Sequence, residues 1–172
     1  HLQSLARAAR GELGDAPATD TAVRGQLRWL LGAIGACPAY IRNGRLDVLA
    51  ENAAARALYR PMFDASTQSP NLALFCFLDQ GAQALFPEWP EVAEETVALL
   101  RAEMGRHPAD TATANIVDRL LEGSPLFRTL GASHDVRRVL AETKSFAHPA
   151  VGPLTLALDA LDFSADSGLP RS

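Results

Sequence analysis

The chain has 172 residues and a mass of 18.4 kDa, the size of one domain with a sizeable core. Its net charge of −4 disfavours a nucleic-acid interface, which needs a dense cationic face. Its apolar runs are shorter than the roughly 18 to 20 residues that span a bilayer, and the N-terminus lacks the apolar core of a secretion signal. We therefore expect a cytoplasmic protein that contacts no membrane, with Cys37 and Cys76 as reduced core thiols.

The first part of the sequence predicts two helices and a hairpin. Residues 2–10 have an amphipathic pattern, small and polar residues follow to residue 20, and residues 21–34 keep apolar side chains at helical spacing. Two strand-like segments then flank Asn43-Gly44, a dipeptide that tolerates the positive φ angles of a type I′ turn. We expect a β-hairpin at this point.

The middle of the sequence predicts mainly helices. Asn52 suits the N-cap of a short helix, and residues 71–85 are apolar enough for a buried helix or a helix with a break. A longer helix is expected from Trp89, because Pro90 and several glutamates suit a first turn. Asp110 and Ser124 are expected to cap two further helices. The inward stripe expected for the long helix is Ala93, Val97, Leu100 and Met104.

The last part predicts a second hairpin. Residues 143–149 read as a strand that carries Lys144, Phe146 and His148 on one face, and residues 154–163 alternate like a half-buried strand. A tight turn at residues 150–152 connects them. Two distant hairpins with helices between them indicate one antiparallel sheet assembled from both ends, which is an α+β arrangement.

The sequence lacks the usual signatures of chemistry. The four histidines have no metal-ligand spacing, no GxSxG segment is present, and the glycines form no phosphate-binding pattern. We therefore predict no catalytic residues, no metal site and no cofactor, and we do not expect an enzyme. His134-Asp135 suits either a sensor pair that titrates near neutrality or a structural contact at the start of a strand, and the structural interpretation is favoured.

Four segments in a fixed order resemble one protein family. Between residues 22 and 162, the chain is similar to the ligand-binding domain of MmyB-like (MltR-like) helix-turn-helix transcription regulators of the XRE family. The segments are PAYIRNGRLDVLAENAAARALY, NLALFCFLDQGAQALFPEWPEVAEETVALLR, SPLFRTLGASHDV and KSFAHPAVGPLTLALDAL.

The resemblance implies a fold, a domain organisation and a role. It implies a PAS-like antiparallel sheet covered by several helices, with N-terminal helices. Residues 1–20 would be an N-terminal helix and linker that follow a DNA-binding domain absent from this chain, and residues 21–172 a PAS-like ligand-binding domain. The implied function is sensory: the domain would bind a small hydrophobic effector such as a fatty acid, form a homodimer, and reach DNA only through the absent domain.

Aromatic and aliphatic side chains are the candidates for such a ligand site, because small-molecule sites are mostly apolar with a few polar groups. A carboxylate head group would need a polar partner at the mouth of the site, and the candidates for that partner are Arg101, Lys144, His134 and Asn52. The alternatives are that all these residues fill an ordinary core, and that the domain serves dimerisation or partner binding without a ligand. The predicted ligand-binding residues are Tyr40, Phe75, Phe86, Trp89, Arg101, Phe127, Leu130, His134 and Leu154.

Overall fold

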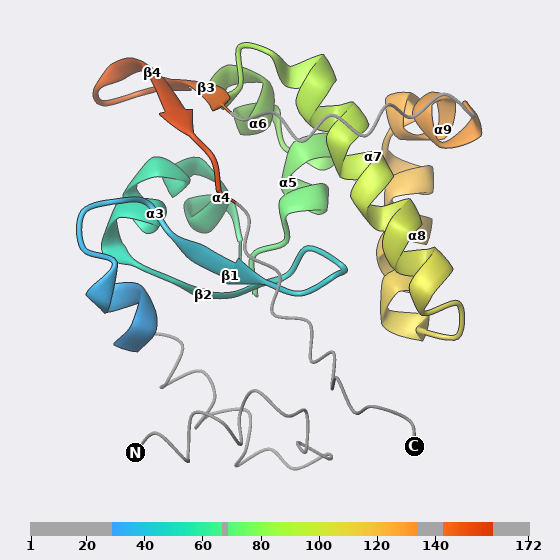
Figure 1. Ribbon diagram of the computed structural model, residues 1–172. Helices are drawn as coiled ribbons and strands as arrows, with labels where there is room; N and C mark the ends of the chain where they lie inside the picture. Colours follow the sequence, from blue (N-terminus) through green and yellow to red (C-terminus); the bar gives the residue numbers. More distant parts are fainter. Residues whose placement is uncertain (1–28, 67–68, 134–142, 160–172) are drawn as a thin grey trace, which may run out of the picture.

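The computed structural model describes residues 29–66, 69–133 and 143–159 (Figure 1). The helix predicted at residues 2–10 and the first part of the helix predicted at 21–34 lie outside the described residues. Residues 29–33 are helical, and Gly35 follows with a φ of +75°. A glycine with positive φ is a common way to end a helix.

The first hairpin forms where it was predicted, but its turn differs. Strand β1 (Tyr40–Arg42) pairs antiparallel with β2 (Val48–Glu51). The predicted type I′ turn is wrong, because the positive φ of +73° falls on Leu46. The amide of Leu46 donates to the carbonyl of Asn43 at 3.1 Å, which makes a three-residue loop with Leu46 in the left-handed position. That conformation costs about 1–2 kcal/mol, which burial of the Leu46 side chain offsets.

Four short helices follow, and polar side chains cap the start of three of them. Asn52 accepts a hydrogen bond from the amide of Ala55, Asn71 accepts from two amides, and Asp79 accepts from the amide of Gly81. Asp79 separates two helices, which confirms the broken helix as the right alternative for residues 71–85. The four helices are α3 (Ala53–Leu58), α4 (Arg60–Ala65), α5 (Leu72–Leu78) and α6 (Gln80–Leu85).

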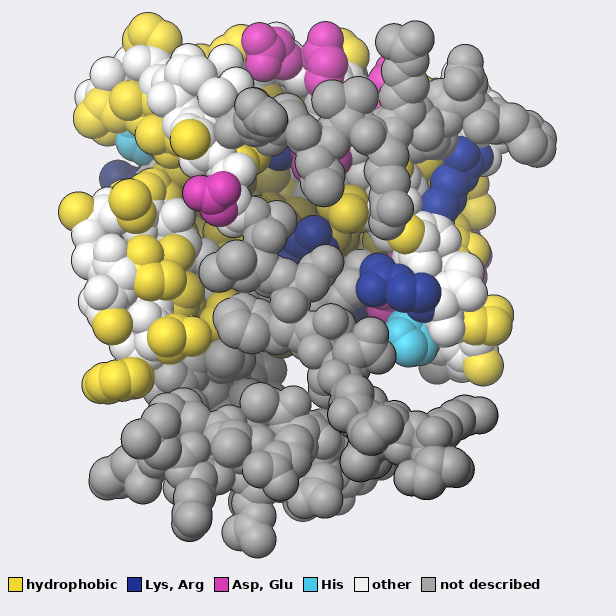
Figure 2. All heavy atoms as spheres, in the orientation of Figure 1, with side chains coloured by type: hydrophobic (Ala, Val, Ile, Leu, Met, Phe, Trp, Pro, Cys, Tyr) yellow, Lys and Arg dark blue, Asp and Glu magenta, His cyan; other side chains and the backbone are white. Residues whose placement is uncertain are grey.

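The next three helices are α7 (Trp89–Arg106), α8 (Thr111–Gly123) and α9 (Pro125–Ala132). The predicted caps are confirmed: Asp110 accepts hydrogen bonds at the start of α8, and Ser124 does so at the start of α9. The inward stripe predicted for α7 is wrong at its last position, since Met104 is 41% exposed and Glu103 is buried. Acidic side chains gather on the upper edge of the molecule, where α7 begins (Figures 1 and 2).

The second hairpin consists of β3 (Thr143–His148) and β4 (Gly152–Ala157), paired so that Phe146 lies opposite Leu154. Within the described residues the two hairpins form two separate sheets, so the single sheet that the sequence suggested is not formed there. Helices and small antiparallel sheets together confirm the α+β class. The PAS-like arrangement stays a prediction.

Two hydrophobic clusters hold the elements together. In Figure 1 both hairpins, α3, α4 and α6 lie on one side, and α8 and α9 lie on the other, beyond α5 and α7. Cys76 is buried as predicted, whereas Cys37 is exposed and is not a core thiol. The hairpin cluster is Val48, Leu58, Tyr59, Met62, Phe75, Ala82, Leu85, Phe86 and Phe146. The helix cluster is Leu46, Ala73, Val97, Leu100, Ile116, Leu120 and Phe127.

Candidate ligand-binding site

Aromatic rings from five parts of the chain meet in and against the hairpin cluster. Tyr59, between α3 and α4, is nearly central, with its ring centroid 5.5 Å from that of Tyr40 and 5.7 Å from that of Phe146. Phe86 lies 5.6 Å from Phe146 and 6.4 Å from Phe75. The Phe86–Phe146 pair is tilted and the other three pairs are edge-to-face, a geometry that stabilises a core beyond the area that it buries. We call these five residues the aromatic group.

Polar groups lie at the edge of the aromatic group. The Nζ atom of Lys144 on β3 is 3.0 Å from Oε2 of Glu95 on α7, and the indole of Trp89 donates to the carbonyl of Cys76 at 2.9 Å. Burial, together with the nearby Tyr40 and Glu95, raises the pKa of Tyr59 well above its usual value. Burial also raises the pKa of the Cys76 thiol to about 11, so this thiol is protonated at neutral pH.

The structure distributes the predicted ligand-binding residues over both clusters. Phe127 belongs to the helix cluster and Leu130 packs against it. His134 lies outside the described residues. Whether any of these residues touches a ligand stays a prediction. The members that belong to the hairpin cluster or pack against it are Tyr40, Phe75, Phe86, Trp89 and Leu154.

Arg101, predicted to meet a carboxylate, is occupied by backbone groups. Its guanidinium donates to the carbonyl oxygens of Gly131 and Ser133, and more weakly to that of Leu130 at 3.5 Å. A cation at the C-terminal end of a helix complements the helix dipole. In this structure Arg101 therefore joins α7 to the last turn of α9.

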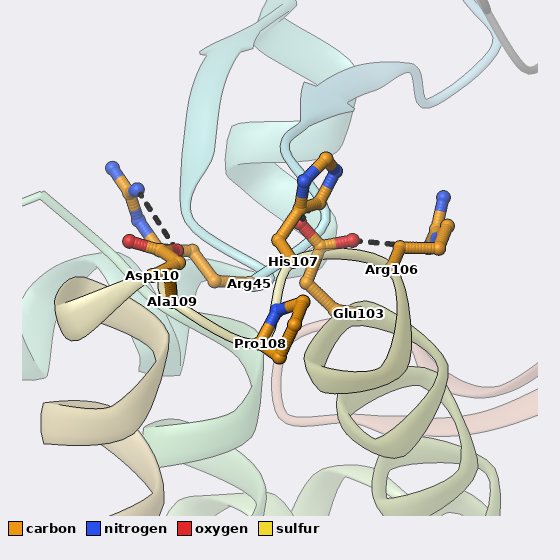
Figure 3. Close-up of a pocket in the computed structure, with 7 residues that line it drawn as sticks. All are labelled: Arg45, Glu103, Arg106, His107, Pro108, Ala109 and Asp110. Atoms are coloured by element: carbon orange, nitrogen blue, oxygen red, sulfur yellow. Dashed lines mark ion pairs between the residues drawn. The ribbon is translucent and has the colours of Figure 1, made fainter.

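A polar hollow of about 540 Å³ lies where the turn between α7 and α8 faces the β1–β2 loop (Figure 3). Its charges are matched in pairs: Arg106 lies 3.1 Å from Glu103, and Arg45 lies 3.9 Å from Asp110. Gly44 leaves room for the Glu103 carboxylate, which a Cβ atom at that position would overlap. We interpret the contacts around this hollow as structural, because they hold the β1–β2 loop against α7 and the start of α8. Its lining is Arg45, Glu103, Arg106, His107, Pro108, Ala109 and Asp110.

The family model of the MmyB-like transcription regulator ligand binding domain matches residues 23–171. The chain belongs to this family. The resemblance seen in the sequence is therefore confirmed. Comparison with curated proteins and with solved structures gave no match.

Membership of the MmyB-like family supports a sensory ligand-binding role, and the family is one of regulator domains rather than of enzymes. Among the described residues, no group of three or more His, Cys, Asp or Glu side chains is placed to hold a metal ion. Over the same part of the chain, no helix has the length and hydrophobicity that crossing a membrane requires.

Several residues in the MmyB-like domain's aromatic group or at its edge were not among the predicted site residues. The alternation along residues 144–148 carried a usable signal for Phe146, which the structure places among the least exposed side chains, at 1%. The helical pattern after Asn52 predicts that Tyr59 turns inward, as it does in the structure, but it gives no sign of a ligand contact. Glu95 had none, because its partner Lys144 is 49 residues away in the sequence.

The lowered pKa of Asp47 leads to a prediction of how the stability of this MmyB-like domain depends on pH. Burial alone would raise its pKa, but hydrogen bonds from Asn43, Asn71 and Arg45, and the charge of Arg45, outweigh burial and lower it. A carboxylate whose pKa is lower in the folded state than in the unfolded state stabilises the fold at pH values above its unfolded-state pKa. That stabilisation is lost as the pH falls through the folded-state pKa. We expect the wild type to lose more stability than Asp47→Asn between pH 7 and about pH 3.

Urea unfolding at both pH values measures this difference. Asp118→Asn on the exposed surface of α8 is the matched control, and it should follow the wild type. Equal acid sensitivity in Asp47→Asn and the wild type would contradict the assignment to Asp47.

Proposed function

We propose that this domain is the sensory part of a bacterial helix-turn-helix transcription regulator of the XRE type, and that it binds a small hydrophobic effector such as a fatty acid. The family match over residues 23–171 carries the proposal. The aromatic group supports it, because an apolar interior with a few polar groups at its edge is the usual chemistry of a small-molecule site.

The hairpin cluster is the place that we favour for the effector. Five of the predicted ligand-binding residues meet there, and they come from both hairpins, α5, the residue that follows α6, and the first turn of α7. An acyl chain that enters between these elements gains about 0.8 kcal/mol for each methylene that it buries. Phe127 lies in the helix cluster and Leu130 packs against it, so we assign these two residues a secondary role in effector binding.

The mechanism that we propose is a population shift. The ring centroids of the aromatic group lie 5.5–6.4 Å apart in neighbouring pairs, so an effector must separate elements that are now in contact. Binding then stabilises the more open packing, in proportion to how much better the effector binds that state. In a homodimer this change alters how two DNA-binding domains are held over a symmetric operator.

The rival function is a dimerisation or partner-binding module of a regulator without a small ligand. The same ring contacts favour it, since rings that touch fill the space between the hairpins. The two functions differ in one observable property, which is whether the domain retains an apolar molecule. Native mass spectrometry of the domain purified from a bacterial host therefore tests the proposal.

A further inference from the structure

A partly buried ion pair joins β3 to α7 at the edge of the aromatic group. The side chains of Lys144 and Glu95 are 16% and 23% exposed, and their charged atoms lie 3.0 Å apart. The Lys144 ammonium also lies 5.9 Å from the ring centroid of Phe86. Leu156 lies opposite Lys144 on β4, so the pair adjoins apolar side chains as well as aromatic rings. A charge in such surroundings interacts more strongly than one in bulk water.

Lys144 differs from the other cations near the predicted ligand-binding residues. Arg101 is engaged by backbone carbonyls at the end of α9. Arg56 is 62% exposed, pairs with Glu51 and stacks on Phe63. The Lys144 ammonium has three donors, and in the described residues its hydrogen bond to a side chain is the one to Glu95.

We propose that Lys144 recognises the acidic head group of the effector, and that Glu95 occupies that position while the effector is absent. This inference rests on the proposed function, because it assigns the head-group end of the same site. A ligand carboxylate has the same charge and the same acceptor geometry as the Glu95 side chain, so it can replace that side chain on the ammonium. Its apolar tail then runs from Lys144 past Phe86 into the aromatic group.

This exchange couples effector binding to the packing of the other helices. Lys144 and Glu95 connect the second hairpin to α7, and α7 packs against α5, α8 and α9. When a ligand carboxylate takes the lysine, Glu95 is released and this connection is lost. An alcohol of the same chain length lacks the charge for this exchange, so the domain selects anionic amphiphiles over neutral ones.

The test compares dodecanoate and dodecanol below their aggregation limits by calorimetric titration of delipidated protein. Lys144→Met alone would leave Glu95 without its partner, so the informative variant is Lys144→Met/Glu95→Gln, which removes both charges. It should bind dodecanoate roughly 10- to 100-fold more weakly, with dodecanol unchanged, as expected for a lost charged hydrogen bond. Glu95→Gln alone should bind dodecanoate about two- to fivefold more tightly, because the competing carboxylate is gone.

The exposed ion pair of Arg60 and Asp64 supplies the matched control, Arg60→Met/Asp64→Asn, which should bind both compounds like the wild type. Equal weakening of both compounds in the Lys144 double variant would overturn the inference and give the pair a structural role. Unchanged dodecanoate binding would also overturn it, while leaving the proposed function intact. If the wild type binds neither compound, the proposed function fails and the inference with it.

Discussion

Replacing Phe146 with alanine is expected to lower the free energy of unfolding by about 3–5 kcal/mol. The side chain is 1% exposed, and its ring lies 5.7 Å from that of Tyr59 and 5.6 Å from that of Phe86. Its removal takes the main buried contact of β3 out of the hairpin cluster and leaves a cavity between elements that cannot fully collapse. Chemical denaturation monitored by circular dichroism measures the loss.

Val151→Ala is the control for Phe146→Ala, because Val151 lies in the turn of the same hairpin and is 65% exposed. We expect it to change stability by less than about 0.5 kcal/mol. A loss below about 1 kcal/mol for Phe146→Ala would mean that the second hairpin contributes little to the core, contrary to its position in the structure.

Replacing Asn71 with alanine is expected to cost about 3 kcal/mol. Asn71 is 4% exposed, and its side-chain oxygen accepts from the amides of Ala73 and Leu74 at the start of α5. Its side-chain amide donates to the carbonyl of Arg45 and to Oδ1 of Asp47, both at 2.9 Å. Alanine therefore removes a helix cap and the link between α5 and the β1–β2 loop. Equilibrium urea unfolding gives the value.

Asn71→Asp separates these two effects. It keeps the acceptor for the helix amides but places a second carboxylate beside Asp47, so we expect it to be destabilised at pH 7. Protonation of one carboxylate at lower pH should restore part of the loss, unlike in Asn71→Ala. Asn115→Ala on the exposed face of α8 should stay within about 0.5 kcal/mol of the wild type. The same loss for Asn71→Asp at pH 7 and pH 4 would argue against the contact with Asp47.

Features set by neighbouring residues were predictable from the sequence. Asn52, Asp110 and Ser124 cap the helices that they were expected to cap, because a cap depends on amides only two or three residues away. The alternation of Lys144, Phe146 and His148 likewise predicted that they share one face of β3, since the side-chain period of a strand is a local property.

Features set by distant contacts were not predictable. Asn43-Gly44 is typical of a type I′ turn, yet Leu46 takes the left-handed conformation because its side chain is needed in the helix cluster. Glu103 replaces Met104 on the inner face of α7 because Gly44, far away in the sequence, leaves room for its carboxylate. The pair of Lys144 and Glu95 depends in the same way on how β3 meets α7.

The central claim is that this MmyB-like domain holds an apolar effector. The most direct measurement is the native mass spectrum of the domain after purification from a bacterial host, followed by organic extraction and identification of the released compounds. We predict a fraction of the protein with an added mass that extraction removes, and an acidic lipid in the extract. A spectrum with the bare chain mass alone, together with an empty extract and no uptake of added dodecanoate, would contradict the claim and favour the partner-binding module.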